Sequence, residues 1–307
     1  MEKKNILKNN NTLGILAATL GGTFWGFSGC CGQYLFSYKG ATSSWLVPIR
    51  LFFSGLLILS LLACQKKDIF VLYKNKKDRV GIILFALFGM MMSQYGYFTA
   101  VQYSNAGTAT VLQYLGQIML LVYVCVTTPR LPKKFEWIAL ALSLSGIFLM
   151  ATQGKPGELS LNAMALIFGI LAAVGFVCYS VQPSDMIRRY TVFPVLGWGM
   201  LFGGMILGII MQPWKMNVQI DGTVILLLAC IIILGSIAAY SLILTAIRLI
   251  GPVKTSLIAC VEPVVAAVLA AAWLKTSYTL MDIIGSILIL LSVVAITLDS
   301  GKEEANE

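Results

Sequence analysis

The sequence predicts an all-α membrane protein in which ten transmembrane helices form two inverted five-helix repeats. Three observations carry this prediction. The composition is 58% hydrophobic with a mean hydropathy of +0.86, apolar runs of membrane-spanning length recur along the 307 residues, and the two halves of the chain carry matching residues. Only 11% of the residues are charged, whereas an ordinary soluble domain has about 25%.

The apolar runs are each long enough to cross a bilayer. A hydrocarbon core of about 30 Å requires about 20 apolar residues in helical conformation. Short polar stretches separate the runs, and the residues at either end of the chain are expected to form solvated cytoplasmic tails, 1–12 and the acidic 299–307. The predicted spans are residues 13–36, 45–64, 80–103, 107–127, 135–151, 161–182, 192–212, 223–247, 251–274 and 279–298.

The distribution of basic residues predicts the orientation of these spans. If the amino terminus is cytoplasmic, 17 of the 22 lysines and arginines lie on the cytoplasmic side, four lie on the outer side, and Arg50 lies within a span. Cytoplasmic loops of membrane proteins carry such an excess of positive charge. Both termini are therefore expected in the cytoplasm, and the net charge of +9 does not indicate a nucleic-acid partner.

The two halves are related by a nearly constant shift along the chain, which indicates duplication. We expect a first repeat at residues 13–152 and a second at 161–298. Because five spans is an odd number, the second repeat enters the membrane from the opposite face, as in many secondary transporters. The matching pairs are Gly26-Phe27 with Gly175-Phe176, Gln33 with Gln182, Pro48 with Pro194, and Thr99-Ala100 with Thr245-Ala246.

Glu262 and Arg50 lie deeper in the predicted spans than the other charged residues, and a charge inside the bilayer costs at least about 2.5–3.5 kcal/mol. Glu262 lies about 10 residues, or roughly 15 Å, into the ninth span, close to the midplane. It is a candidate proton carrier or cation-binding carboxylate; alternatively it bonds backbone groups freed by Pro263, the predicted helix kink. Arg50 is a candidate partner of Glu262 or of a substrate carboxylate, or it extends to the membrane interface.

Amides and aromatic side chains form the second set of candidates. Such groups need partners in hydrocarbon, which either a water-filled cavity or interhelical hydrogen bonds supply. Gln33 and Gln182 are mirror-placed gate candidates, although simple solvation at the interface explains both positions as well. The substrate candidates of this set are Trp25, Gln94, Tyr95, Gln113, Tyr114, Gln117, Tyr179 and Tyr240.

The stretch from Tyr240 to Pro263 resembles the carboxy-terminal repeat of the EamA family in the drug/metabolite transporter superfamily. The motif elements are Ala246 to Arg248, Gly251-Pro252, Ser256 and Glu262-Pro263, and the segment from Ser104 to Leu115 is similar to the partner repeat. The resemblance covers essentially the whole chain. It implies a bacterial plasma-membrane (inner-membrane) protein that carries amino acids, other metabolites or drugs, usually outward, through a cavity among the third, fourth, eighth and ninth spans.

The expected function is secondary transport by alternating access, with export as the direction and a proton as the candidate coupling ion. A passive facilitator of the same fold is the alternative, because one carboxylate does not establish coupling. The expected partners are a small solute and the lipid bilayer. No cofactor or metal is expected, since the chain has no histidine and no Cys-x-x-Cys motif. A membrane-embedded enzyme would need a cluster of catalytic groups and is disfavoured.

Overall fold

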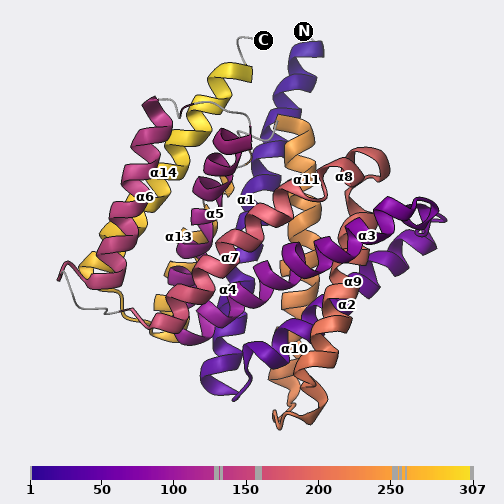
Figure 1. Cartoon of the computed structure of the whole chain (residues 1–307), viewed down its shortest axis with the longest axis horizontal. Helices are drawn as coiled ribbons and strands as arrows, with labels where there is room; N and C mark the ends of the chain where they lie inside the picture. The colour runs from indigo at the N-terminus through magenta and orange to yellow at the C-terminus, as the bar shows by residue number, and fades with distance from the viewer. Residues whose placement is uncertain are drawn as a thin grey trace.

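The computed structural model describes residues 2–127, 131, 134–155, 161–250, 255, 258–259 and 261–304, and all regular structure within these ranges is helical (Figure 1). The helices in chain order are α1 (Glu2–Tyr38), α2 (Ser43–Cys64), η1 (Val71–Lys74), α3 (Lys76–Leu84), η2 (Phe85–Met91), α4 (Met92–Tyr103), α5 (Ala106–Thr127), α6 (Lys134–Thr152), α7 (Ala163–Val181), α8 (Ser184–Tyr190), α9 (Val192–Met211), η3 (Pro213–Lys215), α10 (Gly222–Ile232), η4 (Ile233–Ala238), α11 (Ala239–Ile250), α13 (Val261–Leu274) and α14 (Leu280–Glu304).

Seven helical segments in the described residues are long and apolar enough to cross a membrane. They are Asn11–Tyr38, Ser43–Cys64, Lys76–Tyr103, Ala106–Thr127, Ala163–Val181, Val192–Met211 and Gly222–Ile247. Three shorter apolar helices, Trp137–Met150, Val261–Leu274 and Leu280–Ser292, lie where the other predicted spans fall. The prediction of a multi-helix membrane protein is therefore confirmed, while the crossing of all ten segments stays a prediction.

Polar residues just before several helices fix where those helices begin. Asn105 accepts a hydrogen bond from the Thr108 amide at the start of α5, and Asp221 accepts one from the Val224 amide at the start of α10, each at 2.8 Å. Such side chains satisfy backbone N–H groups that have no partner inside the helix. At the two ends of the chain, α1 begins at Glu2 and α14 continues to Glu304, so parts of the two predicted tails are helical extensions of α1 and α14.

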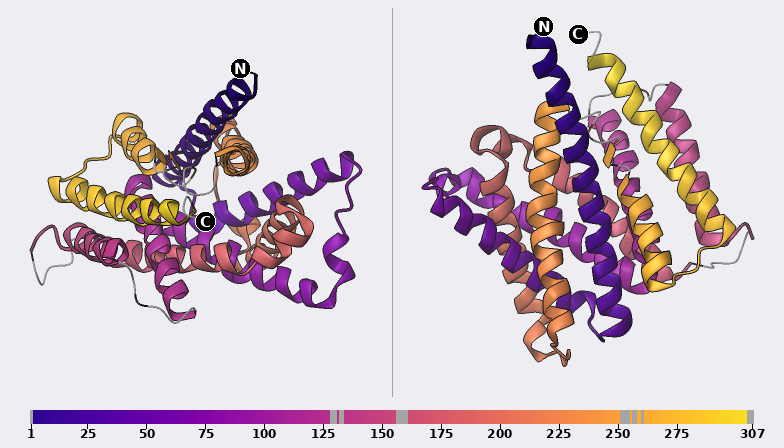
Figure 2. Two further views of the ribbon diagram at one scale, coloured as in Figure 1. Left: turned by 90° about the horizontal axis from the view of Figure 1, so that it is seen from above. Right: turned by 180° about the vertical axis from the view of Figure 1, so that it is seen from behind.

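The helices of the two halves interlock rather than forming two separate bundles (Figures 1 and 2). Two contacts join equivalent helices of the two halves: α2 packs along α9, and α6 packs along α14. The contact of α4 with α7 has its counterpart in that of α11 with α1, and the contact of α5 with α7 has its counterpart in that of α13 with α1. Each contact of this set thus recurs, or maps onto itself, when the two halves are exchanged.

Glycines allow the closest helix contacts. A Cβ atom on Gly204 of α9 would overlap the backbone of Phe52 in α2, and one on Gly26 of α1 would lie 2.7 Å from the carbonyl oxygen of Glu262 in α13. Membrane helices commonly use small residues to bring backbones together. Gly26 therefore allows α1 to pack directly against the turn that carries Glu262.

Two π-helical segments occupy corresponding places in the two halves. The segment η2 lies between α3 and α4, and η4 lies between α10 and α11, so each interrupts the third long helical span of its half. A π-helical turn is wider than an α-helical turn and is frequently found at functional sites. Ser236 in η4 shows this wider geometry, since its hydroxyl donates to the carbonyl of Ile231, five residues earlier, at 3.4 Å.

Candidate functional site

A cavity of about 290 Å³ lies among helices of both halves. Its wall is formed by α1, α2, α5, α7 and α11, the first turns of α4 and α13, and the first residue of α9. None of its described lining residues comes from the segments that connect helices at the end of the bundle away from the termini. The lining residues are Trp25, Ser28, Arg50, Ser93, Gln94, Tyr97, Gln113, Tyr114, Gln117, Phe176, Tyr179, Ser180, Val192, Tyr240, Ile243, Leu244, Ile247, Thr255, Ala259 and Glu262.

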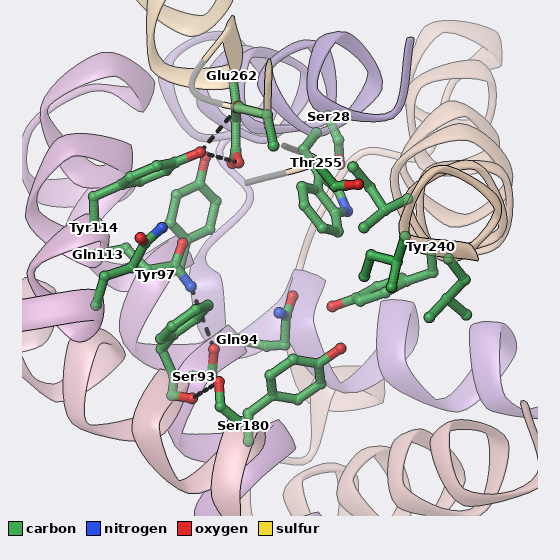
Figure 3. Close-up of a pocket in the computed structure, with 18 of the residues that line it drawn as sticks. Ser28, Ser93, Gln94, Tyr97, Gln113, Tyr114, Ser180, Tyr240, Thr255 and Glu262 are labelled. Atoms are coloured by element: carbon green, nitrogen blue, oxygen red, sulfur yellow. Dashed lines mark hydrogen bonds between the residues drawn. The ribbon is translucent and has the colours of Figure 1, made fainter. Parts of the chain in front are cut away.

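Glu262 lies in the cavity wall near the start of α13 and is 9% exposed. Its carboxylate accepts a hydrogen bond from the Tyr114 hydroxyl at 3.3 Å, which Figure 3 shows across the top of the cavity. Among the described residues, no lysine or arginine nitrogen lies within 4.0 Å of this carboxylate. Glu262 therefore lacks the positively charged partner that would compensate a permanent negative charge at this depth.

Pro263 explains why Tyr114 points at this position. Proline has no backbone N–H, so the carbonyl oxygen of Ala259, four residues earlier, loses its helical donor. The Tyr114 hydroxyl donates to that oxygen at 3.0 Å and also approaches Glu262. Tyr114 therefore supplies a donor to the carbonyl that the missing helical bond leaves free, whereas an ionised carboxylate has no proton to donate to it.

Arg50 is 5% exposed in α2 and lines the cavity. Its Nε donates to the Ser236 hydroxyl at 3.2 Å, and its Nη2 donates to the Gly235 carbonyl at 3.4 Å, both in η4. The guanidinium carbon lies 4.8 Å from the centroid of the Phe98 ring, a cation–π contact. The side chain therefore extends into the protein rather than to the membrane interface, and it makes no direct ion pair with Glu262.

Two amides of the cavity have no side-chain hydrogen bond to any described residue: Gln94 of α4 and Gln117 of α5. By contrast, Gln113 donates to the Ser93 hydroxyl at 3.3 Å. Unpartnered amide groups on a cavity wall are available to water or to a solute. These residues supply neutral donors and acceptors to a cavity that Glu262 and Arg50 also line.

Aromatic rings form a continuous part of the wall. Trp25 meets Tyr240 edge to face with ring centroids 5.2 Å apart, and Tyr240 lies 6.3 Å from Tyr179. Tyr179 in turn contacts Phe176 at 6.4 Å. This row of rings offers apolar area together with phenol groups, which suits a solute with both apolar and polar parts.

Tyr95 differs from the other sequence candidates, because it does not line the cavity. Its hydroxyl lies 3.0 Å from the Ser44 hydroxyl in α2, and its ring packs edge to face on Phe168. Every other candidate of the two substrate sets lies in the cavity wall. Whether those side chains bind the solute stays a prediction.

The end of the bundle away from the termini is closed by a set of hydrogen bonds that we call the Gln33 network. Gln33 donates to the Thr276 hydroxyl at 2.9 Å and accepts from the Ala106 amide at 2.8 Å. The Tyr278 hydroxyl donates to the Asn105 side chain at 3.0 Å. The bonds of Thr276 and Tyr278 join the first half of the chain to the segment between α13 and α14, and the Gln33–Ala106 bond joins α1 to the start of α5.

An exposed ion pair adds to the closure at this end. Lys39 contacts Asp221 at 2.5 Å, and this pairing raises the pKa of Lys39 and lowers the pKa of Asp221 from their ordinary values. Ion pairs in contact with water are worth little, because water and salt screen them. The pair therefore adds less to the closure than the buried Gln33 network does.

Gln182, the repeat mate of Gln33, lies at the opposite end of the bundle. Its Nε2 donates to the Gly81 carbonyl at 2.7 Å, while its Oε1 is buried and has no hydrogen-bond partner. Close by, Asp78 accepts two hydrogen bonds from Arg189, at 2.7 and 3.1 Å, and one from Tyr190 at 2.8 Å. The mirror-placed glutamines thus lie at opposite ends but have different partners.

Several cavity residues are not distinguished by sequence reasoning alone. Ser28, Ser93 and Ser180 are small residues in apolar helices, where serine also serves as a packing residue. The one available signal is helical spacing: Ser28 follows Trp25 by three residues and Ser180 follows Phe176 by four, which places each pair on one helix face. Of the family-like motif, Gly251-Pro252 and Ser256 lie outside the described residues.

Comparison with known proteins gives the family. The EamA-like transporter family model matches residues 12–152 and again residues 163–298. The chain is 35% identical over 289 residues, with 94% of this chain and 96% of the relative covered, to YicL of Salmonella typhimurium strain LT2, described as an uncharacterized inner membrane transporter. It is 23% identical over 280 residues to an uncharacterized transporter of Clostridium kluyveri, with 89% of each chain covered.

A solved structure described as "Crystal structure of protein" has the same fold. The TM-score is 0.62 at 15% sequence identity, and the match covers 97% of this chain and 99% of the other. Two matched family segments that together span almost the whole chain, and a relative of 35% identity over nearly its full length, agree with the helical architecture and the shared cavity. The chain belongs to the EamA-like transporter family, a family of membrane transporters and not of enzymes.

Proposed function

We propose that this protein is a secondary transporter that exports a small metabolite, such as an amino acid or a related compound, or a drug, by alternating access. The arrangement of the cavity carries this proposal. It lies where helices of both halves meet, extends toward one end of the bundle and is closed at the other end by the Gln33 network. A pathway that is closed on one side only is what alternating access requires of each of its two states.

The proposed topology has ten membrane crossings in two inverted repeats, with both termini in the cytoplasm. Three observations support it: helix contacts recur when the halves are exchanged, N and C termini lie at the same end in Figure 1, and basic residues are concentrated on the side assigned to the cytoplasm. In this topology the cavity of the present structure faces the cytoplasm of the plasma membrane. The Gln33 network is then the outer gate.

Inverted repeats give a physical route to the second state. If the halves exchange conformations, the side that is now closed opens and the side that is now open closes. The Gln33 network contains three hydrogen bonds between side chains or backbone groups, each worth about 1 kcal/mol net. Their sum is comparable to the few kcal/mol that separate interconverting states of a protein. The outer gate is therefore stable enough to close and weak enough to open.

We propose Glu262 as the proton site. A carboxylate at this depth is costly when charged and has no positive partner among the described residues, so it gains from binding either a proton or a positively charged group of the solute. If only one of these binds at a time, solute taken up from the cytoplasm displaces a proton, and a proton from outside displaces the solute. This competition couples export to proton entry.

Inside-out membrane vesicles containing the protein test the function. With radiolabelled amino acids outside, we expect accumulation in the lumen when the lumen is acidic, because protons leaving the lumen drive solute inward. Vesicles without the protein are the control. Uptake that reaches equilibrium equally fast with and without the pH gradient would identify a passive facilitator, and uptake equal to that of control vesicles would contradict the proposal for these solutes.

A further inference from the structure

The Arg50 guanidinium is a buried cation that has no carboxylate in direct contact among the described residues. At 5% exposure it is bonded by a hydroxyl and a carbonyl, and among the described residues no carboxylate oxygen lies within 4.0 Å of it. Its Nη1 donates to no described residue. Burying a charge is costly unless an opposite charge compensates it. Because Arg50 lines the cavity, an anionic group of the solute can supply that charge.

The Ser28 hydroxyl is a second unsatisfied polar group, and it lies beside Arg50. Ser28 is 2% exposed, lines the cavity, and its hydroxyl has no hydrogen-bond partner in the part of the chain that the structure describes (Figure 3). A Cβ atom on Gly235 would overlap this hydroxyl and would lie 3.7 Å from Nη2 of Arg50. The Ser28 hydroxyl and the Arg50 guanidinium therefore both lie beside Gly235 of η4. A buried hydroxyl without a partner is rare in proteins and calls for an explanation.

We propose that Arg50 and Ser28 form an anion subsite that binds a carboxylate of the transported solute. The guanidinium provides charge and directional N–H donors, and the serine hydroxyl provides a third donor from a different helix. This inference builds on the proposed function and specifies it: the solute bears a carboxylate at this subsite. Its apolar part lies along the ring of Trp25 and the rings beyond it.

The size of the cavity is consistent with a small solute. About 290 Å³ is at the lower end of the roughly 300–1,000 Å³ range of ligand pockets. Benzoate, which combines one carboxylate with one aromatic ring, is therefore a suitable probe. Benzamide and benzylamine have nearly the same shape, but the first is neutral and the second is positively charged.

Thermal unfolding of the purified full-length chain in detergent tests the subsite. We expect benzoate to raise the Tm in a concentration-dependent manner, while benzamide at equal concentration and ionic strength does not. Any stabilisation by benzylamine, which the Glu262 carboxylate can bind, should be unchanged in Arg50→Gln. Arg50→Gln should abolish the benzoate effect. Ser28→Ala should weaken binding about tenfold, the factor that corresponds to about 1.4 kcal/mol.

Ser54→Ala is the matched control. Ser54 is also fully buried with an unpartnered hydroxyl, and it lies in α2 one turn after Arg50, but it does not line the cavity. Benzoate binding should be unchanged in this variant. Size-exclusion profiles establish that each variant is folded. If Arg50→Gln fails this check, the benzoate affinities of Ser28→Ala and Ser54→Ala are compared to test the subsite.

Two results would overturn the subsite: benzoate that stabilises the protein no better than benzamide, or Ser28→Ala and Ser54→Ala variants that bind benzoate equally well. The proposed function fails separately. Benzoate binding without solute accumulation in vesicles would leave the subsite intact and refute transport, whereas gradient-driven accumulation without Arg50-dependent anion binding would refute only the subsite.

Discussion

Glu262→Gln is expected to reduce gradient-driven accumulation in inside-out vesicles more than about tenfold, to the level of passive equilibration. The amide has almost the same shape as the carboxyl group but binds no proton at physiological pH, so it removes coupling with little effect on packing. Glu262 is the one carboxylate among the described lining residues of the cavity, and it has no positive partner within 4.0 Å. No other described cavity residue is therefore available to replace it.

The measurement compares initial rates with an acidic and with a neutral lumen. Asp185→Asn is the control, because Asp185 is an exposed carboxylate in α8 that does not line the cavity. Glu262→Asp keeps a titratable group and should retain part of the gradient response. Wild-type accumulation by Glu262→Gln would show that the coupling proton binds elsewhere.

Locking the outer gate is expected to stop transport in both directions. With Gln33 and Thr276 both replaced by Cys, a short bifunctional methanethiosulfonate should cross-link the two positions, whose side chains now share a 2.9 Å hydrogen bond. The cross-link would hold α1 against the segment between α13 and α14, so the outward-open state cannot form. We expect the transport rate to fall more than about tenfold, since a covalent bond exceeds the few kcal/mol that normally separate the states.

This experiment needs a background without the seven native cysteines. The Thr276→Cys single variant treated with the same reagent controls for modification itself, and reduction of the cross-linked double variant should restore transport. Undiminished transport by the fully cross-linked protein would mean that the Gln33 network does not open during the cycle.

Hydropathy and charge position predict the helical membrane architecture because both reflect the bilayer, which acts on each residue separately. A run of about 20 apolar residues is recognisable without knowing its neighbours. The same reasoning identifies Glu262, Gln94 and Gln117 as candidates, since a polar group in an apolar run needs a polar partner or a solute whichever way the helix packs. This reasoning does not distinguish Tyr95, which follows Gln94 by one residue. Successive side chains of a helix differ in direction by about 100°, so Tyr95 points to Ser44 and not into the cavity.

Hydropathy and charge position do not predict which residues far apart in the sequence bond one another. Arg50 bonds Ser236, 186 residues away, and Ser236 lies in η4, a π-helical segment that no periodicity in the sequence indicates. Tyr114 is aligned by the carbonyl that Pro263 frees, which depends on how α5 packs beside α13. The sequence names Pro263 as a kink, but only the packing shows that its effect is to position a phenol beside Glu262.

Alternating access of one shared cavity is the central claim, and side-specific labelling of Gln117→Cys in the cysteine-free background tests it most directly. Gln117 lines the cavity and bonds no described side chain. With the Gln33–Thr276 cross-link formed, a membrane-impermeant thiol reagent should label this position from the cytoplasmic side only; after reduction, during turnover, it should label it from the outer side as well. Labelling from the outer side while the cross-link is intact would contradict the account.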